Sequence, residues 1–316
     1  MMSDVKITLL PFADLSGYTE GFTIVSAQWG HDGLAYVLLM NEVPARKQGM
    51  FVQTALEQRY TYKVLVASED YIEEIVIPEQ QYFYHYVQPL HDDLLLVGAR
   101  AAYYGREQYD RNARVWSREG VEIRDFLLGD GIQNVQVSRK GTIWVSYFDE
   151  GVYGNYGWSD PVGASGLIAW DSKGNIRYKN TAALIDDCYA LNVVNEKEIW
   201  FYYYSDFQLG HITNGVHTES SQVAFIHPGI SGSSGFCTDG RNFLFEAGYD
   251  KHGTSFQFKT LDTSGQLSTG KVIEFVNEEH GSLQYVQQDC RKDRLLLCTE
   301  QALYVVTLEE VQAMLE

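Results

Sequence analysis

Carboxylate side chains are the residues of this sequence that could most readily bind a metal ion. Acids lie at the ends of several short apolar runs, and the candidate ligands among them are Glu20, Asp187 and Glu279. If these runs are strands around one axis, their carboxylates would form a ring of oxygen atoms, which suits Ca²⁺ or another divalent cation. The alternative is that each acid only caps a strand or a turn.

Histidine is the side chain best suited to acid–base chemistry at neutral pH. In "GYDKHG", His252 follows Asp250 by two positions, so a carboxylate could orient the imidazole. These two residues are the catalytic candidates, although a single loop histidine is more often solvated than catalytic. The serine-rich stretch "GISGSSGF" lacks the strand-turn-helix context that exposes a nucleophile. The sequence therefore contains no complete catalytic motif.

The stretch "DEGVYGNYGWSDPVGASG", residues 149–166, combines five glycines with three aromatic residues. Tyr153, Tyr156 and Trp158 offer flat faces for a sugar, an aromatic ligand or a protein partner, but they could equally pack over the strands of their own domain. It is not a phosphate-binding loop, because it lacks the Gly-Lys-Ser/Thr ending. The same stretch begins with a further ligand-binding candidate, Asp149, and other predicted loops contribute the remaining ones, which are Arg100, Asp206 and Tyr249.

Short strands must position these residues, because apolar residues alternate with others in many short runs. The segments "IQNVQVSRKGTIWVSYFDEG" and "SGLIAWDSKGNIRYKN" contain four such runs, separated by two Lys-Gly turns and the glycine-rich loop. Four antiparallel strands make one propeller blade. The polar turn and the apolar strand after it recur six times at intervals of 44 to 60 residues, which predicts six blades with variable loops. The equivalent positions are Leu34, Leu94, Ile143, Ile199, Phe243 and Leu295.

The two ends of the chain predict how the ring closes. The last unit lacks a fourth strand, whereas "VKITLLPF" stands alone before the first unit, so we expect residues 5–11 to complete the last blade. Thr307 and Glu310 have capping-box spacing, which predicts a short helix in "TLEEVQAMLE". The predicted fold is an all-β, six-bladed propeller that forms a single domain over residues 1–316.

Composition narrows the class of partner. With 42 acidic and 24 basic residues the net charge is −18, which argues against nucleic acid and anionic membrane surfaces as partners.

The start of the chain lacks the pattern of a cleaved signal, and no long apolar run occurs. We therefore expect a cytoplasmic protein with reduced thiols. The cysteines show no metal-binding spacing, and they are Cys188, Cys237, Cys290 and Cys298.

The segment "SRKGTIWVSYFDEGV" resembles the short propeller repeats of bacterial sensor ectodomains and related six- and seven-bladed proteins. In those repeats a D-x-x-G-x-[IL]-W-V turn precedes the second strand. The resemblance covers one blade well and the others in outline. It implies a propeller of bacterial type and no particular activity.

Propeller geometry places the long loops together. Loops after the second strand and loops before the inner strand share one face, and here those loops are aromatic and acidic. We therefore expect a non-enzymatic binding scaffold for a protein, a peptide or a carbohydrate. The alternative is a metal-dependent hydrolase, lactonase or lyase with a cation at the channel mouth.

Overall fold

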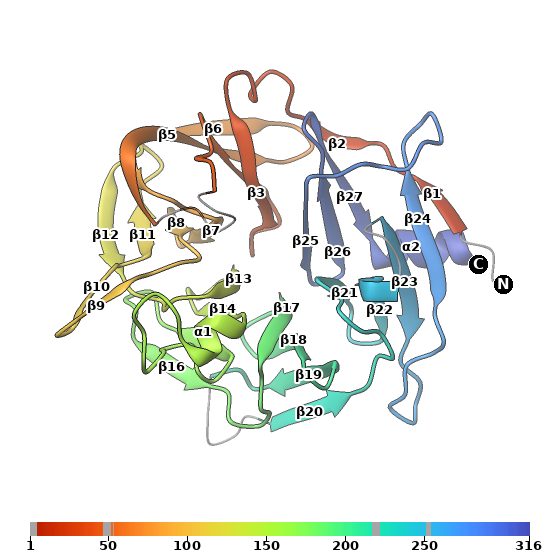
Figure 1. The fold of residues 1–316 in the computed structure, drawn as a ribbon. Helices are drawn as coiled ribbons and strands as arrows, with labels where there is room; N and C mark the ends of the chain where they lie inside the picture. The colour runs from red at the N-terminus through yellow and green to blue at the C-terminus, as the bar shows by residue number, and fades with distance from the viewer. Residues whose placement is uncertain (1–4, 47–51, 53, 217–221, 251–253) are drawn as a thin grey trace.

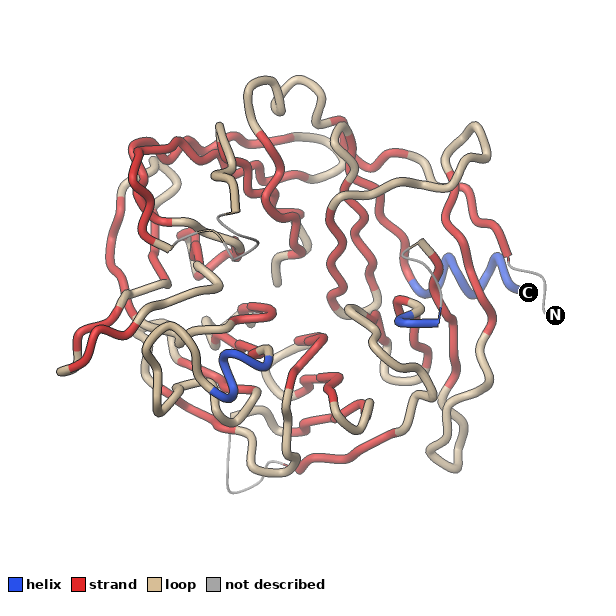
Figure 2. The backbone as a smooth tube through the Cα atoms, viewed as in Figure 1, coloured by secondary structure: helices blue, strands red, loops and turns tan. Residues whose placement is uncertain are grey.

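The fold is a ring of six sheets, each of four or five strands, around a common axis (Figure 1). The computed structural model describes residues 5–46, 52, 54–216, 222–250 and 254–316. Strands dominate the chain and helices are few and short (Figure 2). The all-β, six-bladed propeller predicted from the repeats is therefore confirmed. None of the helices in these ranges is long and apolar enough to cross a bilayer.

The first three blades follow one another along the chain, each from an inner strand outward. Blade one consists of β3 (Thr23–Trp29), β4 (Ala35–Met40), β5 (Ala55–Ala67) and β6 (Ile72–Tyr82). Blade two consists of β7 (Tyr86–Leu90), β8 (Asp93–Val97), β11 (Ala113–Trp116) and β12 (Glu122–Phe126), with an inserted hairpin of β9 (Tyr103–Gly105) and β10 (Gln108–Tyr109). Blade three consists of β13 (Ile132–Val137), β14 (Ile143–Tyr147), β15 (Leu167–Trp170) and β16 (Ile176–Lys179), with α1 (Asp149–Tyr153) after β14.

The other three blades continue the same order. Blade four consists of β17 (Asp187–Val193), β18 (Glu198–Tyr204), β19 (Gln208–Thr213) and β20 (Gln222–Ile226). Blade five consists of β21 (Phe236–Thr238), β22 (Asn242–Glu246), β23 (Ser255–Thr260) and β24 (Lys271–Val276), with the 3₁₀ turn η1 (Gly248–Asp250) after β22. Blade six contains β25 (Gln287–Arg291), β26 (Arg294–Cys298) and β27 (Ala302–Thr307).

The hydrophobic core lies between blades. Among the described residues, buried apolar side chains form six clusters, and each cluster joins two adjacent blades. Between blades one and two, for example, Leu38 and Val64 pack with Val87 and Leu96. Because each sheet is covered on both faces, its central strands are almost wholly apolar, as in Ala35–Met40. This packing fixes the blades as a rigid frame for the loops.

The N-terminal segment closes the ring, but with a different strand from the one expected. β2 (Pro11–Asp14) pairs antiparallel with β27 and completes blade six. The expectation that residues 5–11 form this strand was wrong in position, because β1 (Val5–Thr8) instead pairs parallel with β24 of blade five. The segment thus joins two blades, and it covers the outer edges of both sheets.

The C-terminal helix forms as the capping-box spacing predicted. α2 (Leu308–Leu315) starts at Thr307, whose side chain accepts from the backbone N–H of Glu310 while the Glu310 carboxylate accepts from that of Thr307. Leu308 and Val311 are buried in the cluster between blades five and six. The helix lies beside β1, as Figure 1 shows, so the two ends of the chain pack on the same part of the ring.

Candidate functional site

Polar side chains from the inner strands occupy the axis of the ring. Five inner strands each contribute one, and these side chains are Gln28, Gln88, Gln136, Asn192 and Asp289. All five residues are buried. Buried amides and carboxylates need partners, and here they find them on the backbones of other blades.

Gln136 illustrates how this axial network joins the blades. Its Nε2 donates to the carbonyls of Leu191 at 3.1 Å and Cys290 at 2.9 Å, which belong to blades four and six. Its Oε1 accepts from the backbone N–H of Val193 at 2.8 Å. One side chain of blade three therefore holds two other inner strands in register.

Arg291 completes the network from blade six. Its Nη2 donates to the Val137 carbonyl at 2.6 Å and its Nη1 to Gln88 Oε1 at 3.2 Å. Nearby, the Asp289 carboxylate accepts from the backbone N–H of Trp29 at 2.7 Å. Burial raises the pKa of Asp289 to about 7, although the Trp29 N–H and the Arg291 charge favour its ionised form. Burial lowers the pKa of Arg291 to about 10.

A cavity of about 440 Å³ lies over this network, at the end of the channel where the inner strands begin. This is the end that receives the loops preceding the inner strands, and Glu246 at the end of β22 also reaches it. We call it the channel mouth. Its lining is Ser26, Ala27, Gln28, Tyr86, Gln133, Asn134, Tyr189, Ser234, Glu246, Tyr285, Val286, Gln287, Gln288 and Asp289.

One wall of the channel mouth is fixed by hydrogen bonds. Gln288 Nε2 donates to Ser234 Oγ at 2.9 Å, and the Ser234 backbone N–H donates to Glu246 Oε2 at 3.0 Å. Glu246 Oε1 also accepts from the backbone N–H of Gly248 at 3.1 Å. On the opposite wall the Tyr86 hydroxyl donates to main-chain carbonyls of blade three. These bonds hold the lining in place before any ligand arrives.

Several polar atoms in this lining lack partners. Within the described part of the chain, no hydrogen bond reaches the buried Ser26 Oγ, Asn134 Oδ1 or Gln288 Oε1. Ser26 is only 7% exposed. Two of the three atoms are amide oxygens, which can only accept a hydrogen bond. A buried polar atom without a partner is costly, so these acceptors indicate a place where donors from outside the fold can bind.

An aromatic group borders the channel mouth on blades four and five. The Tyr189 ring stacks on Tyr204 at 6.2 Å between centroids, and its hydroxyl shares a 2.6 Å hydrogen bond with that of Tyr249. Phe207 packs against Tyr204 at 5.4 Å and against Tyr249 at 5.9 Å. Tyr204 is 42% exposed and Tyr249 is 64% exposed, so the group presents ring faces to solvent beside the cavity. Tyr249 was a predicted ligand contact, and it lies here.

Asp187, a predicted metal ligand, begins β17 two residues before Tyr189. Its pKa is raised to about 7, mainly by burial and in smaller part by the nearby Asp149 carboxylate. Its Oδ1 is buried and has no hydrogen-bond partner among the residues described. The structure thus brings Asp187 near Asp149, which was a predicted ligand residue and is exposed at the start of α1.

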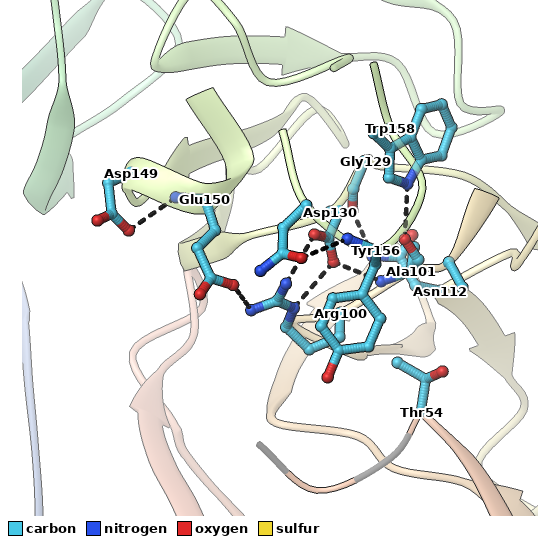
Figure 3. Close-up of polar contacts among 12 residues, drawn as sticks. Thr54, Arg100, Ala101, Asn112, Gly129, Asp130, Asp149, Glu150, Tyr156 and Trp158 are labelled. Atoms are coloured by element: carbon cyan, nitrogen blue, oxygen red, sulfur yellow. Dashed lines mark hydrogen bonds and ion pairs between the residues drawn. The ribbon is translucent and has the colours of Figure 1, made fainter. Parts of the chain in front are cut away.

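Arg100, another predicted ligand contact, is instead fully buried in an ion-paired cluster (Figure 3). Its Nε and Nη2 donate to the two carboxylate oxygens of Asp130, each at 2.9 Å, and its Nη1 pairs with Glu150. The Tyr156 ring covers the guanidinium at 4.1 Å. Burial raises the pKa of Asp130, and the Arg100 charge opposes this effect. The cluster joins the ends of β8 and β14 to the start of β13, so it fastens blade two to blade three.

The glycine-rich loop divides between packing and exposure. Trp158 Nε1 donates to the Ala101 carbonyl at 2.6 Å (Figure 3). The Trp158 ring lies 4.8 Å from that of Tyr103. Tyr156 covers Arg100, so both of these aromatic residues pack on blade two. Tyr153 is 66% exposed, and its hydroxyl donates to the Asp186 carboxylate. Of the three predicted contacts, Tyr153 is exposed, whereas Tyr156 and Trp158 are half-buried.

The remaining predicted residues do not gather at one point. Asp206 is exposed in the turn between β18 and β19, and Asp250 ends η1. His252 lies outside the described residues. The metal candidates Glu20 and Glu279 are exposed in turns before β3 and after β24. In the described ranges, no group of three or more His, Cys, Asp or Glu side chains is placed to hold a metal ion.

The axial network and the channel mouth were not recognised in the sequence. One signal was present, because the apolar inner strands carry isolated amides in "AQWG", "VQPL", "VQVS" and "LNVV". A Gln or Asn at the same place in four successive units is unusual for a buried strand, since each amide must find partners there. The residues that line the channel mouth just before these amides, such as Ser26, Tyr86 and Asn134, do not repeat one residue type from blade to blade.

The chain is thus a six-bladed β-propeller. Hydrogen bonds join its inner strands at the axis, and a polar cavity lies at one end of that axis. A family model, that of the YxzG family, matches residues 163–306, which run from the loop before β15 into β27. No curated protein sequence matches the chain.

Solved structures agree on the fold. A chain of the mitotic checkpoint complex is 8% identical over 98% of both chains, with a TM-score of 0.51. Kluyveromyces lactis Hsv2 is 10% identical over 90% of this chain and 73% of its own, with a TM-score of 0.50. At such low sequence identities the similarity shows a shared fold and gives no information about function, which must be argued from the candidate site.

Proposed function

We propose that this protein is a non-enzymatic binding module and that its channel mouth takes a positively charged amine of a peptide or protein partner. The acceptors Asn134 Oδ1 and Gln288 Oε1 carry this proposal, because they have no partner among the described residues and can accept hydrogen bonds from a ligand. An ammonium group supplies three donors and no acceptor.

Charge and aromatic surface support the same ligand. Apart from tyrosines, the ionisable side chains that line the mouth within the described ranges are two acids, Glu246 and Asp289. Tyr189 and Tyr249 add ring faces, which attract a cation through their negative π surface. The net charge of −18 also favours the approach of basic partners.

The proposal is tested by calorimetric titration of N-acetyl-lysine methylamide against N-acetyl-norleucine methylamide, which has a similar shape and no ammonium group. We expect saturable binding of the lysine derivative alone. Gln288→Ala should weaken it roughly tenfold or more, since a hydrogen bond to a charged group contributes about 1.5 to 3 kcal/mol. Gln222→Ala, an exposed position on the outer strand of blade four, serves as the matched control.

Two outcomes would contradict the proposal. Equal binding of the norleucine derivative would show that the charge is not recognised. Equal affinity of Gln288→Ala and the control would show that the ligand binds elsewhere. Binding of glucose or N-acetylglucosamine in place of the amine would assign the mouth to a carbohydrate instead.

A hydrolase or lyase is the second candidate, and the raised pKa of Asp187 favours it. A carboxyl group with a pKa of about 7 can act as a general acid at neutral pH, and Asp149 lies near it. This candidate needs no metal ion. If the protein is such an enzyme, Asp187→Asn should abolish turnover of the substrate and leave substrate binding intact. Loss of binding together with turnover would argue against an acid–base role of Asp187.

A further inference from the structure

A second cavity, of about 330 Å³, lies at the opposite end of the channel, where turns connect the inner strands to the second strands. Its lining comes from blades one and six and consists of Trp29, Gly30, His31, Asp32, Gly33, Arg291, Lys292, Asp293 and Arg294. Arg291 also belongs to the axial network, through its hydrogen bonds to Gln88 and Val137.

The unpartnered atoms of this lining are nitrogens, in contrast to those of the mouth. Trp29 Nε1, His31 Nε2 and Arg291 Nε are buried and have no hydrogen-bond partner among the residues described. Trp29 is 1% exposed and Arg291 is 3% exposed. Indole and guanidinium nitrogens can only donate. An acceptor-rich group from outside the fold would pair with these two nitrogens, and also with His31 Nε2 in the tautomer that carries a proton there.

The charges around this cavity also differ from those at the mouth. Arg291, Lys292 and Arg294 bring three cations, whereas the acids are Asp32 and Asp293. The Asp32 carboxylate is already engaged, because one oxygen accepts from the Leu34 N–H at 3.2 Å and the other from the Tyr36 hydroxyl at 2.7 Å. The cations of this lining therefore exceed its acids by one, and the Asp289 and Glu196 carboxylates also lie near Arg291.

His31 fits an anion site as a neutral donor. Burial lowers its pKa, and the charges of Arg291 and Arg139 lower it further, while Asp32 and Glu196 act in the opposite direction. A neutral imidazole can present its Nε2–H to a bound anion.

We propose that this cavity binds an oxyanion, the phosphate or carboxylate group of a small molecule, through Arg291, His31 and the cations of Lys292 and Arg294. A guanidinium bound to an oxyanion makes a charge-assisted hydrogen bond, which is among the strongest available to a protein. The two ends of the channel then bind opposite kinds of group. This inference does not depend on the proposed function of the mouth, because different residues carry it.

The test follows the imidazole proton resonances of His31 during titration with inorganic phosphate, with sodium chloride matched in ionic strength. We expect a saturable shift with phosphate and none with chloride, and acetate distinguishes a carboxylate site from a phosphate site. The double variant Lys292→Gln/Arg294→Gln should weaken binding at least tenfold. Arg111→Gln removes one exposed cation from blade two and should leave binding unchanged.

Arg291 itself is left in place, because its replacement would disturb the axial network. A shift that does not saturate, or that chloride reproduces, would overturn the proposal. Equal affinities in Lys292→Gln/Arg294→Gln and Arg111→Gln would also overturn it, because they would place the anion elsewhere. Phosphate binding that persists when the lysine derivative fails to bind would separate this site from the mouth.

Discussion

Replacing Arg100 by methionine should destabilise the protein far more than the same change at an exposed arginine. In the fold Arg100 is fully buried, and Asp130 beside it is 3% exposed. Arg100→Met removes the cation and leaves the Asp130 carboxylate buried with only part of its hydrogen bonds, since the Ala101 N–H remains at 2.8 Å. Breaking one partner of a buried pair costs about 3 to 5 kcal/mol of the free energy of unfolding.

Arg111 provides the matched control on the same blade. It pairs with Asp125 at 2.9 Å, but its side chain is 58% exposed and that of Asp125 is 34% exposed. Exposed pairs contribute about 0 to 1 kcal/mol, so Arg111→Met should change stability little. The expected difference between the two variants is therefore roughly 3 kcal/mol or more.

Urea unfolding followed by tryptophan fluorescence measures this difference. The double variant Arg100→Met/Asp130→Asn removes both charges, so it should cost less than the sum of the two single variants. Equal midpoints for Arg100→Met and Arg111→Met would refute the reasoning. Strict additivity of the two single changes would likewise show that Arg100 and Asp130 do not stabilise the fold as a pair.

Three further predictions concern other parts of the frame. Asp289→Asn should flatten the pH dependence of stability. Because the pKa of Asp289 is raised to about 7, the parent protein should lose roughly 4 kcal/mol of its free energy of unfolding between pH 4 and pH 7, and the variant should not show this loss. Urea unfolding at several pH values should therefore show a difference between the two proteins that changes by this amount as pH rises. Parallel curves would contradict this. Thr307→Ala should cost about 1 kcal/mol in thermal unfolding, because it removes the cap of α2, and an unchanged melting temperature would count against it. Gly131→Ala should lower the free energy of unfolding by more than about 1 kcal/mol, because φ is +68° and a Cβ would lie 2.2 Å from the Gly151 nitrogen. A variant as stable as the parent protein in urea unfolding would contradict this close approach.

The repeated turn and strand made the number of blades predictable. Ile143, Phe243 and Leu295 lie in the second strands of their blades, where the polar turn followed by apolar residues predicted them. The N-terminal strand was misplaced because "VKIT" and "PFAD" both read as short strands, and only the packing of blades five and six decides which sheet each joins.

The candidate site was harder to predict. Aromatic residues in a glycine-rich loop suit a ligand or a neighbouring blade equally well, and Tyr156 and Trp158 pack on blade two because Arg100 and Ala101 offer a cation and a carbonyl there. The residues of the channel mouth come from different blades, so no local spacing connects Asn134 with Gln288. Their unpartnered oxygens become evident only when the inner strands are placed together.

The most direct test of the central claim is a titration of protein labelled with ¹³C in its tyrosine rings. With N-acetyl-lysine methylamide, the account predicts saturable shifts of Tyr86, Tyr189 and Tyr285, which line the mouth, and no shift of Tyr71, which is 52% exposed on the rim of blade one. Shifts confined to tyrosines outside the mouth, or no shift at ligand concentrations of about 10 mM, well above ordinary affinities, would contradict it.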